Sequence, residues 1–511
     1  MTANNRFQSE AMQHDALEIG TRLKALPSTS MVSSAFADEL NNEARLFTAV
    51  GLADIAHTWV ALELKTIPKF AGRELLAYLL ALQAAPDSFV LTPENGDIYT
   101  NREAWLTERT DAVNWLGAGR ARREAVTTGF ILVVRQDLIE LIDHLIDLAT
   151  TLVQQAEQHL TAIMPDYTYL QAAQPTTFGH YLLGFAYPLL RDLERLEQVY
   201  ARLNLSPMGC GSTNGSRLLQ GRQALAECLG FDGLIAHARD AMWQADLFIE
   251  ITSILTACSI SISRLAEDLQ IFCSQEFALV ELADKHARAS KIMPHKKNPF
   301  ALTHLRGVAN KLIGLTASVA ASVRTPTGQP DNRTLIYGAL PDALENVSHA
   351  TVLMAEVLDA MVFNQHRAKT LASSGWVLAT ELAETVVLLD GLDVRSAHRL
   401  LAYLASEYRE LSLPELDYQN LQAAAKKLLG RTLAMTKQQF SSALDLDGAI
   451  QARLEPGGTA SASMNTMIVE CRQRLLEYRE RNWSRQEHIS GKIQTLLALA
   501  KRETSHDPDN V

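Results

Sequence analysis

The sequence is poor in cysteine, with five residues of this type among 511. The number is odd, and no two of them have the close spacing of a metal-binding pair. Cys258 falls within an apolar pattern of helical period, where a structural thiol is expected. The five are Cys210, Cys228, Cys258, Cys273 and Cys471. This usage argues against a disulfide framework or a cysteine metal site, and predicts reduced thiols in a cytoplasmic protein.

Long uncharged apolar runs and an excess of basic residues are also missing. No uncharged apolar run reaches about 18 residues, so we expect no membrane span. The first ten residues, MTANNRFQSE, have no apolar core, so we expect no signal peptide. The formal net charge of −11 at pH 7 argues against a nucleic-acid or anionic-membrane partner. Basic residues therefore matter where they cluster.

Aromatic residues make up only 6% of the chain and strand signals are scarce, whereas alanine and leucine, good helix formers, are abundant. Between residues 246 and 273, apolar residues recur at alternating spacings of three and four. Because this pattern lasts more than three heptads, it predicts a long helix packed in a bundle. Other long helices are predicted at 127–160, 179–203, 303–324 and 342–362. We predict an all-α fold.

Polar segments containing glycine and proline interrupt these helices. They lie at 93–101, 117–126, 164–176, 206–221, 287–299 and 325–341. In a long bundle such loops gather at helix ends, where irregular backbone can face solvent or ligand. The last helical part, 366–475, contains the turn EPGGTAS, and we predict that the tail from Glu503 is frayed.

One of these loops, ARASKIMPHKKNPF at 287–300, combines a serine with several cations. Lys291 and Lys296 would attract a carboxylate, and Asn298 can both donate and accept hydrogen bonds. Ser290 could act as a base if neighbouring cations and amides lowered its pKa. Without context, a solvated basic loop is the simpler interpretation.

The context favours a site. SKIMPHKKNP resembles the GSSxMPxKxNP signature of the fumarase/aspartase superfamily, and the preceding SRLAEDLQIFCSQEFALVELAD resembles its argininosuccinate lyase branch. The resemblance extends over almost the whole chain. The other similar segments are LTERTDAVNWLGAGRARREAV (106–126), YTYLQAAQPTTFGHYLLGFA (167–186), SPMGCGSTNGSRLLQGRQALAECLGFDG (206–233) and LDLDGAIQARLEPGGTASASM (444–464). Several specific motifs in the right order identify the chain as a member of this superfamily.

The resemblance implies a three-domain helical subunit that forms a homotetramer with active sites shared between subunits. It divides the chain into an N-terminal helical domain (1–115), a central long-helix bundle (116–365) with the signature loop 287–299, and a C-terminal helical domain (366–511) with the frayed tail. The implied partner is a small molecule that contains a succinyl group.

The reaction implied by the resemblance is an anti elimination that releases fumarate. A base removes a proton next to a carboxylate, the carbanion is delocalised into that carboxylate, and the C–N bond breaks. Ser290 matches the family's catalytic serine, and Lys296 and Asn298 match its carboxylate-binding residues. The other residues implied to hold the succinyl group are Thr168, Gln174 and Arg122.

The chain departs from the family at its acid relay. Tyr169 replaces the histidine of the YTH motif, and Thr303 replaces the glutamate that pairs with that histidine. Loss of both the histidine and the glutamate is expected if the pair works as a unit, because removing one partner leaves the other without its counter-charge. Tyr169 remains the catalytic candidate at this position, although a phenol with a pKa near 10 is a weak acid. Nearby His180 is interpreted as structural.

The charge of the predicted site also changes. The family motif GRSRND reads GRARRE here, so Arg122 is kept while Arg123 replaces a neutral asparagine that contacts substrate. Lys291 replaces the second serine of the signature loop. Arg123 and Lys291 are therefore candidate substrate-binding residues. The site gains up to two positive charges, unless Glu124 pairs with one of them.

The segment that recognises arginine in the family is not found. The family motif YNxDxQEDK corresponds to QPDNRTLIYG (329–338), which contributes Arg333 as a candidate substrate-binding residue. The tyrosine, glutamine and lysine of the motif become Gln329, Thr334 and Tyr337. We expect no arginine-recognising pocket.

We predict a lyase that cleaves the C–N bond of an N-succinyl substrate and releases fumarate. A leaving group that departs as a stable anion, or that protonates itself, needs no enzymatic acid. A weakly basic nitrogen species, such as nitrite, a hydrazine or an N-substituted amine, would suit a site with extra cations. Two alternatives stay open: a genuine argininosuccinate lyase with a rearranged site, and a catalytically silent structural homologue. The sequence contains neither a metal-ligand cluster nor a nucleotide-binding loop, so we expect no metal and no organic cofactor.

Overall fold

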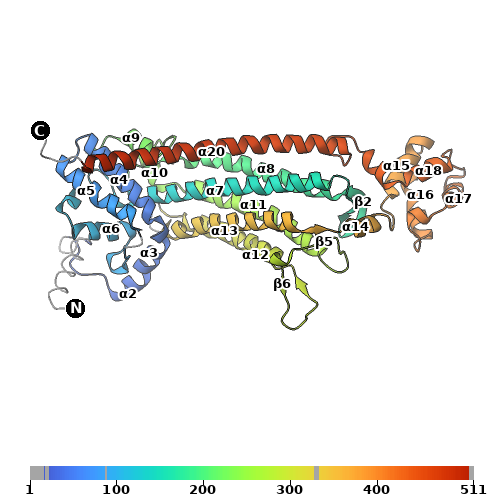
Figure 1. Ribbon diagram of the computed structural model, residues 1–511, viewed down its shortest axis with the longest axis horizontal. Coiled ribbons are helices and arrows are strands. Elements are labelled where there is room, and N and C mark those ends of the chain that lie inside the picture. The colour runs from blue at the N-terminus through green and yellow to red at the C-terminus, as the bar shows by residue number, and fades with distance from the viewer. Residues whose placement is uncertain (1–16, 18–21, 87–88, 327–332, 506–511) are drawn as a thin grey trace.

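The computed structural model describes residues 17, 22–86, 89–326 and 333–505 of the chain. Its centre is an elongated bundle of long helices (Figure 1). The bundle consists of α7 (Arg122–Gln158), α8 (Phe178–Leu203), α11 (Asp246–Phe272), α12 (Phe300–Ser322), α13 (Thr334–Ala360) and α20 (Ser461–Ser505). The prediction of an all-α fold is confirmed, and α11 coincides with the segment that its heptad pattern marked.

Three predicted loops are partly helical. Asp97 caps α6 (Ile98–Thr107) by accepting a hydrogen bond from the backbone N–H of Thr100, so a helix begins inside the predicted loop 93–101. Likewise α7 begins at Arg122 and α13 at Thr334. Pro341, which favoured a loop at 325–341, lies buried inside α13. The glycine and proline residues predicted the starts of these three helices several residues too late. Packing of the bundle overrides the local preference of these residues for loops.

The N-terminal part is an almost continuous helical run followed by shorter helices at one end of the bundle (Figure 1). A π-helical turn, η1 (Val32–Phe36), and a 3₁₀ turn, η2 (Ala44–Leu46), interrupt the run. Its regular parts are α2 (Thr29–Met31), α3 (Ala37–Glu43) and α4 (Phe47–Glu63). After the run come α5 (Lys69–Ala84), η4 (Pro93–Asn95), α6 and η5 (Asp111–Trp115).

The opposite end carries a cluster of helices with its own core, which consists mainly of buried leucine and alanine residues (Figure 1). Its elements are α15 (Ala379–Asp390), α16 (Val394–Glu407), η8 (Leu413–Glu415), α17 (Tyr418–Leu429), α18 (Lys437–Ala443) and α19 (Leu446–Gln451). From there α20 runs back along the whole bundle. The predicted domain boundaries stay a prediction, but α20 packs on the bundle and the N-terminal helices.

The tail is less frayed than predicted. Glu503 belongs to α20, and its carboxylate accepts a hydrogen bond from Nε of Arg73 on α5 at 2.8 Å. The composition of the tail cannot predict an ion pair between residues that lie 430 positions apart in the sequence. Residues 506–511 lie outside the described part of the chain.

The strands are short and form pairs near helix ends. The longest pair is β1 (Ile163–Thr168) with β2 (Gln171–Thr177), and the signature loop is closed by β6 (Arg288–Ala289) with β7 (Lys297–Asn298). The others are β3 (Leu205–Ser206) with β4 (Gly233–Leu234) and β5 (Val280–Glu281) with β8 (Val362–Phe363). The remaining short helices are α9 (Arg222–Cys228), α10 (Ala238–Trp243), η6 (Asp284–His286) and α14 (Gln365–Ala372).

Helix α11 is long and apolar enough to cross a membrane by length and composition alone. Half of its most apolar window is buried inside the subunit, where it packs against α8, α12 and α13. A core helix of a bundle has the same composition, because all-round apolar character also suits burial in a large core.

Candidate active site

The predicted site residues fall into three groups that one subunit holds far apart. Arg122 is the first residue of α7, whereas Thr168 lies in the hairpin that follows the end of this helix. At 1.5 Å per residue, the 37 residues of α7 span about 55 Å. The signature loop is a third group, which projects sideways from the bundle at β6 (Figure 1). A single subunit therefore does not bring the three groups together.

The signature loop folds around the Ser290 hydroxyl. The backbone N–H groups of Ile292 and Met293 donate to Ser290 Oγ at 3.3 and 3.0 Å. Asn298 Nδ2 donates to the carbonyl oxygen of Arg288 at 3.0 Å and so closes the base of the hairpin. Two N–H dipoles directed at one oxygen favour its negatively charged form. The loop thus gives Ser290 a local environment that suits a base.

The loop adds little to the core of the subunit. Ile292 is 84% exposed, and Lys291 and Lys296 are exposed as well. Lys297 is used locally, because its Nζ lies 3.0 Å from Glu281 and 2.7 Å from Asp284. Lys291 and Lys296 are the other exposed lysines that accompany Ser290.

Tyr169 stands at the tip of the β1–β2 hairpin and is fully exposed. Tyr169 and Leu170 form a two-residue turn in which both have positive φ, 54° and 58°. Hairpins favour such turns, but positive φ is uncommon for residues other than glycine. Tyr167 anchors the strand, with its ring packed against Phe272 and Phe277. The hairpin also presents Thr168 and Gln174, both exposed.

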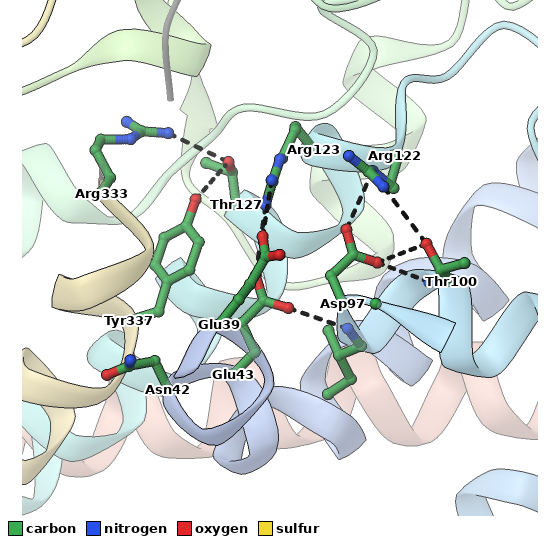
Figure 2. A network of polar contacts seen from close by, with 12 residues as sticks. Glu39, Asn42, Glu43, Asp97, Thr100, Arg122, Arg123, Thr127, Arg333 and Tyr337 are labelled. Atoms are coloured by element: carbon green, nitrogen blue, oxygen red, sulfur yellow. Dashed lines mark hydrogen bonds and ion pairs between the residues drawn. The ribbon is translucent and has the colours of Figure 1, made fainter. Parts of the chain in front are cut away.

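The third group lines a cleft of about 1230 Å³ between the N-terminal helices and the start of α7. Arg122 is half-exposed, and its Nε lies 3.1 Å from Oδ2 of the buried Asp97. Nη2 of Arg123 donates to Glu39 Oε1 at 2.8 Å, and its Nη1 lies 3.5 Å from Glu43 Oε1 (Figure 2). Two acidic side chains from α3, Glu39 and Glu43, therefore contact the cation that the sequence indicated as an added charge.

Glu124 does not pair with Arg123. It is fully buried, and its carboxylate accepts hydrogen bonds from the backbone N–H groups of Gly209 at 2.6 Å and Gly211 at 2.9 Å, and from Cys210 Sγ at 3.3 Å. Burial raises the pKa of the Glu124 carboxyl. The sequence suggested Glu124 as the partner of Arg123 because the two residues are adjacent in the chain. Glu39, 84 residues earlier, had no local signal that could have revealed it.

Arg333 is almost fully buried beside the cleft. Its Nη1 donates to the carbonyl oxygen of Gln244 at 3.2 Å, and its Nη2 to Thr127 Oγ1 at 3.4 Å. The Tyr337 ring packs against Phe130 in the core, with its hydroxyl 3.5 Å from the same Thr127 (Figure 2). The role of Arg333 in substrate binding stays a prediction. Gln329 lies outside the described residues.

His180 has the structural surroundings that its sequence context indicated. Its Nε2 lies 3.0 Å from the carbonyl oxygen of Gly457 and its Nδ1 lies 3.1 Å from Thr176 Oγ1. It thereby ties the start of α8 to the turn before α20. Over the described residues, no group of three or more His, Cys, Asp or Glu side chains could hold a metal ion. The expectation that no metal is needed stays a prediction.

Glu43 should make stability depend on pH. Burial, assisted by the nearby Asp97 carboxylate, raises the pKa of Glu43 to about 8. The folded protein therefore holds a proton that the unfolded chain releases above about pH 4.3, so this stabilising contribution is lost as the pH rises toward 8. We expect the unfolding temperature of wild type to fall more steeply between pH 6 and 8.5 than that of Glu43→Gln. Glu63→Gln, an exposed change on α4, should keep the wild-type slope, and equal slopes in all three proteins would contradict the assignment.

The comparisons with known proteins point to one family. The family model described as lyase matches residues 28–314. The argininosuccinate lyase of Methanococcoides burtonii is 32% identical over 461 residues, which cover 89% of this chain and 92% of the relative. That of Schizosaccharomyces pombe is 33% identical over 76% of this chain and 83% of its own length.

Solved structures share the fold at lower identity. An EDDS lyase in complex with formate has a TM-score of 0.84 and 24% identity, covering 96% of this chain and 98% of its own. The class II fumarase of Schistosoma mansoni has a TM-score of 0.65 and 14% identity, covering 85% of this chain and 94% of its own.

Proposed function

Because the chain belongs to the argininosuccinate lyase-like branch of the fumarase/aspartase superfamily, we propose that it cleaves the C–N bond of an N-succinyl compound and releases fumarate, with a leaving group other than arginine. The observation that carries this proposal is the signature loop, in which two backbone N–H groups converge on Ser290 Oγ beside exposed lysines. Ser216 accepts from two backbone N–H groups in the same way, so the hydrogen bonds support the proposal together with the residue types that match the superfamily's signature.

In the proposed mechanism Ser290 removes a proton from the carbon next to a substrate carboxylate. The resulting carbanion is delocalised into that carboxylate, and its electron pair then forms the double bond of fumarate as the C–N bond breaks. The C–N bonding pair stays on the nitrogen, which is already protonated in the substrate and therefore leaves as a neutral amine or hydrazine. The proton on carbon is too weakly acidic for water to remove, so the developing charge needs fixed donors. Lys296 and Asn298 would supply them at the carboxylate, and Thr168, Gln174 and Arg122 would hold the rest of the succinyl group.

We propose a homotetramer in which each active site takes its three groups from different subunits. The separation of Arg122 from Thr168 along α7 supports this, because no motion within one subunit closes a gap of about 55 Å. The exposed apolar side chains of Ile260 on α11 and Ile313 on α12 are available for contacts between bundles. All five cysteines are free thiols, which suits a reducing compartment such as the cytoplasm.

The changed leaving-group region supports a substrate other than argininosuccinate. Tyr337 packs in the core and Arg333 is buried, so neither side chain is free to hold an arginine tail. The site gains less positive charge than the sequence indicated, because Glu39 pairs with Arg123. Nitrite is therefore less favoured than an amine or hydrazine with a larger substituent.

A panel of N-succinyl compounds, incubated with the purified protein while fumarate absorbance is followed, tests the proposal. Release from an N-substituted aspartate but not from argininosuccinate is the expected outcome. Release from argininosuccinate alone would make the chain a genuine argininosuccinate lyase. If no compound releases fumarate, the silent structural homologue becomes the better interpretation.

Replacing Tyr169 by phenylalanine should have a mild effect. The side chain is fully exposed in the subunit, and a phenol is a poor substitute for the lost imidazolium. We expect kcat with the preferred substrate to fall by less than about tenfold, which corresponds to about 1.4 kcal/mol. A drop of about a hundredfold in kcat would instead assign Tyr169 as the general acid.

The companion variant restores both relay residues, as Tyr169→His with Thr303→Glu. We expect it to gain no argininosuccinate lyase activity at a rate typical of the family, because the residues that would bind the arginine end are still absent. Substantial cleavage of argininosuccinate by this variant would place specificity in the relay and not in the 329–338 segment.

A further inference from the structure

The base of the signature loop is not held by tight packing. The loop projects sideways from the bundle, and the hydrogen bonds described for residues 290–296 all stay within it (Figure 1). Arg288 of β6 lies over the ring of Phe300 at the start of α12, but both residues adjoin the base itself. A cavity of about 520 Å³ lies beside the base, and its lining includes Lys297 and Pro299. Because a cavity lacks the contacts of a close-packed interior, packing alone does not fix the direction of the loop.

Lys297 connects this base to two other elements. Its Nζ lies 3.0 Å from Glu281 of β5 and 2.7 Å from Asp284 of η6. Hydrogen bonds to Asp284 and Glu281 raise the pKa of Lys297, and the hydrogen bond from Lys297 lowers the pKa of Asp284. Both groups are therefore charged at neutral pH. One ammonium thus binds two carboxylates between the loop and the bundle.

The two carboxylates belong to segments that the bundle holds in place. Strand β5 pairs with β8, where Glu281 lies opposite Val362. Segment η6 contains the buried His286, whose Nε2 lies 3.5 Å from Glu356 Oε2 on α13. Since β8 directly follows α13, both segments are attached to the end of this long helix. Lys297 is then the contact between a fixed support and a projecting loop.

The position of Lys297 affects the proposed catalytic base. Ala289 and Lys297 are partners in the β6–β7 pair, and Ser290 follows Ala289 directly. The backbone N–H of Ser290 also donates to the carbonyl oxygen of Lys296 at 3.4 Å. A rotation of β7 would therefore carry both Ser290 and Lys296 with it. Because one subunit holds the three groups of the site far apart, the direction of the loop decides whether they meet.

We infer that Lys297 is a positioning residue, whose ion pairs with Glu281 and Asp284 set the direction in which the loop presents Ser290 to substrate held by other subunits. The inference rests on the proposed function and adds to it a residue that does not touch the substrate. Exposed ion pairs stabilise weakly and are screened by salt, so their removal should redirect the loop without unfolding the subunit.

Three variants test the inference by the kinetics of fumarate release: Lys297→Met, the double variant Glu281→Gln with Asp284→Asn, and all three changes together. We expect each of the first two to raise KM about tenfold and to lower kcat by less than about threefold, because substrate bound by Lys296 and Asn298 pulls the loop back. The triple variant should lose no more than Lys297→Met alone, since all the changes remove the same contacts.

Two further substitutions serve as a rescue and as a control. Lys297→Arg should keep KM within about twofold of wild type, because a guanidinium can also bind two carboxylates. Lys285→Met removes an exposed lysine of η6, so it changes the net charge equally, and it should behave as wild type. If Lys297→Met raises KM while the double carboxylate variant does not, Lys297 contacts the substrate and the inference is wrong. It is equally wrong if neither variant changes KM.

The freedom of the loop is also measured without turnover. Thermolysin cuts before exposed apolar residues such as Ile292, and mass spectrometry follows the cutting of the loop in the assembled protein. We expect Lys297→Met and the double carboxylate variant to be cut at least about threefold faster than wild type and Lys285→Met. A less constrained loop reaches the conformation that a protease needs more often. Equal rates of cutting in all four proteins would overturn the inference.

The two measurements distinguish the inference from the proposed function. If no N-succinyl compound releases fumarate while the rates of cutting differ as expected, the proposed function fails and the anchoring of the loop by Lys297 stands. If fumarate is released and KM is the same in wild type and all variants, only the inference fails. If neither fumarate release nor a difference in cutting is found, both are wrong.

Discussion

Ser290→Ala is expected to lower the rate of fumarate formation by at least about a thousandfold, the scale of losing a positioned catalytic base. The hydroxyl oxygen is the atom on which the N–H groups of Ile292 and Met293 converge, and alanine removes it. The effect should appear in kcat with little change in affinity, because Lys296 and Asn298 remain to bind the substrate. Steady-state kinetics by fumarate absorbance measures it.

The Ser290→Ala substitution should leave the fold and the assembly intact. The loop is exposed, so the variant should keep the circular dichroism spectrum and the mass of wild type in light scattering. His295→Ala, an exposed change in the same loop, is the control and should retain activity within a few-fold. Turnover of Ser290→Ala at the wild-type rate would show that Ser290 is not the base.

Mixing two inactive proteins extends this test to the assembly. If sites are shared, Ser290→Ala and Arg122→Ala subunits reassembled together should form some sites that contain both an intact loop and an intact arginine. Part of the wild-type activity should then return, although neither variant is active alone. No recovery after verified subunit exchange would argue that each site belongs to one subunit.

Asp54→Ala should cause the largest loss of stability, about 3–5 kcal/mol. Asp54 lies fully buried on α4, and its carboxylate accepts hydrogen bonds from Arg102 Nε at 3.0 Å and from Arg120 Nη2 at 2.7 Å. Both guanidiniums are about 1% exposed. Removing the carboxylate leaves two cations buried without their shared counter-charge. Activity should also fall, since Arg120 supports the turn that leads into Arg122.

Urea unfolding followed by circular dichroism measures this effect, with Glu250→Ala as the control. Glu250 pairs with Arg202 on the surface, where both side chains are substantially exposed. An exposed pair of this kind contributes at most about 1 kcal/mol, because water and salt screen it. A loss for Asp54→Ala no larger than that of the control would mean that the buried arginines find other partners.

The order of the helices could be predicted from sequence because the signals for it are local. The heptad pattern of 246–273 predicted α11 from residues three and four apart. The signature loop around Ser290 was likewise recognisable, since its residue types stand next to one another. Helix starts were less accurate, as at α13, because a buried proline inside a helix gives the same local signal as a loop.

The sequence by itself thus determined the helical class, the family resemblance and the loop that carries Ser290. Only the tertiary structure decided the electrostatics of the cleft. It placed Glu39 and not Glu124 beside Arg123, and it separated Arg122 from Thr168 by the length of α7. The physical reason is that helix propensity acts between near neighbours in sequence, whereas the partner and the burial of a charge depend on how distant helices pack.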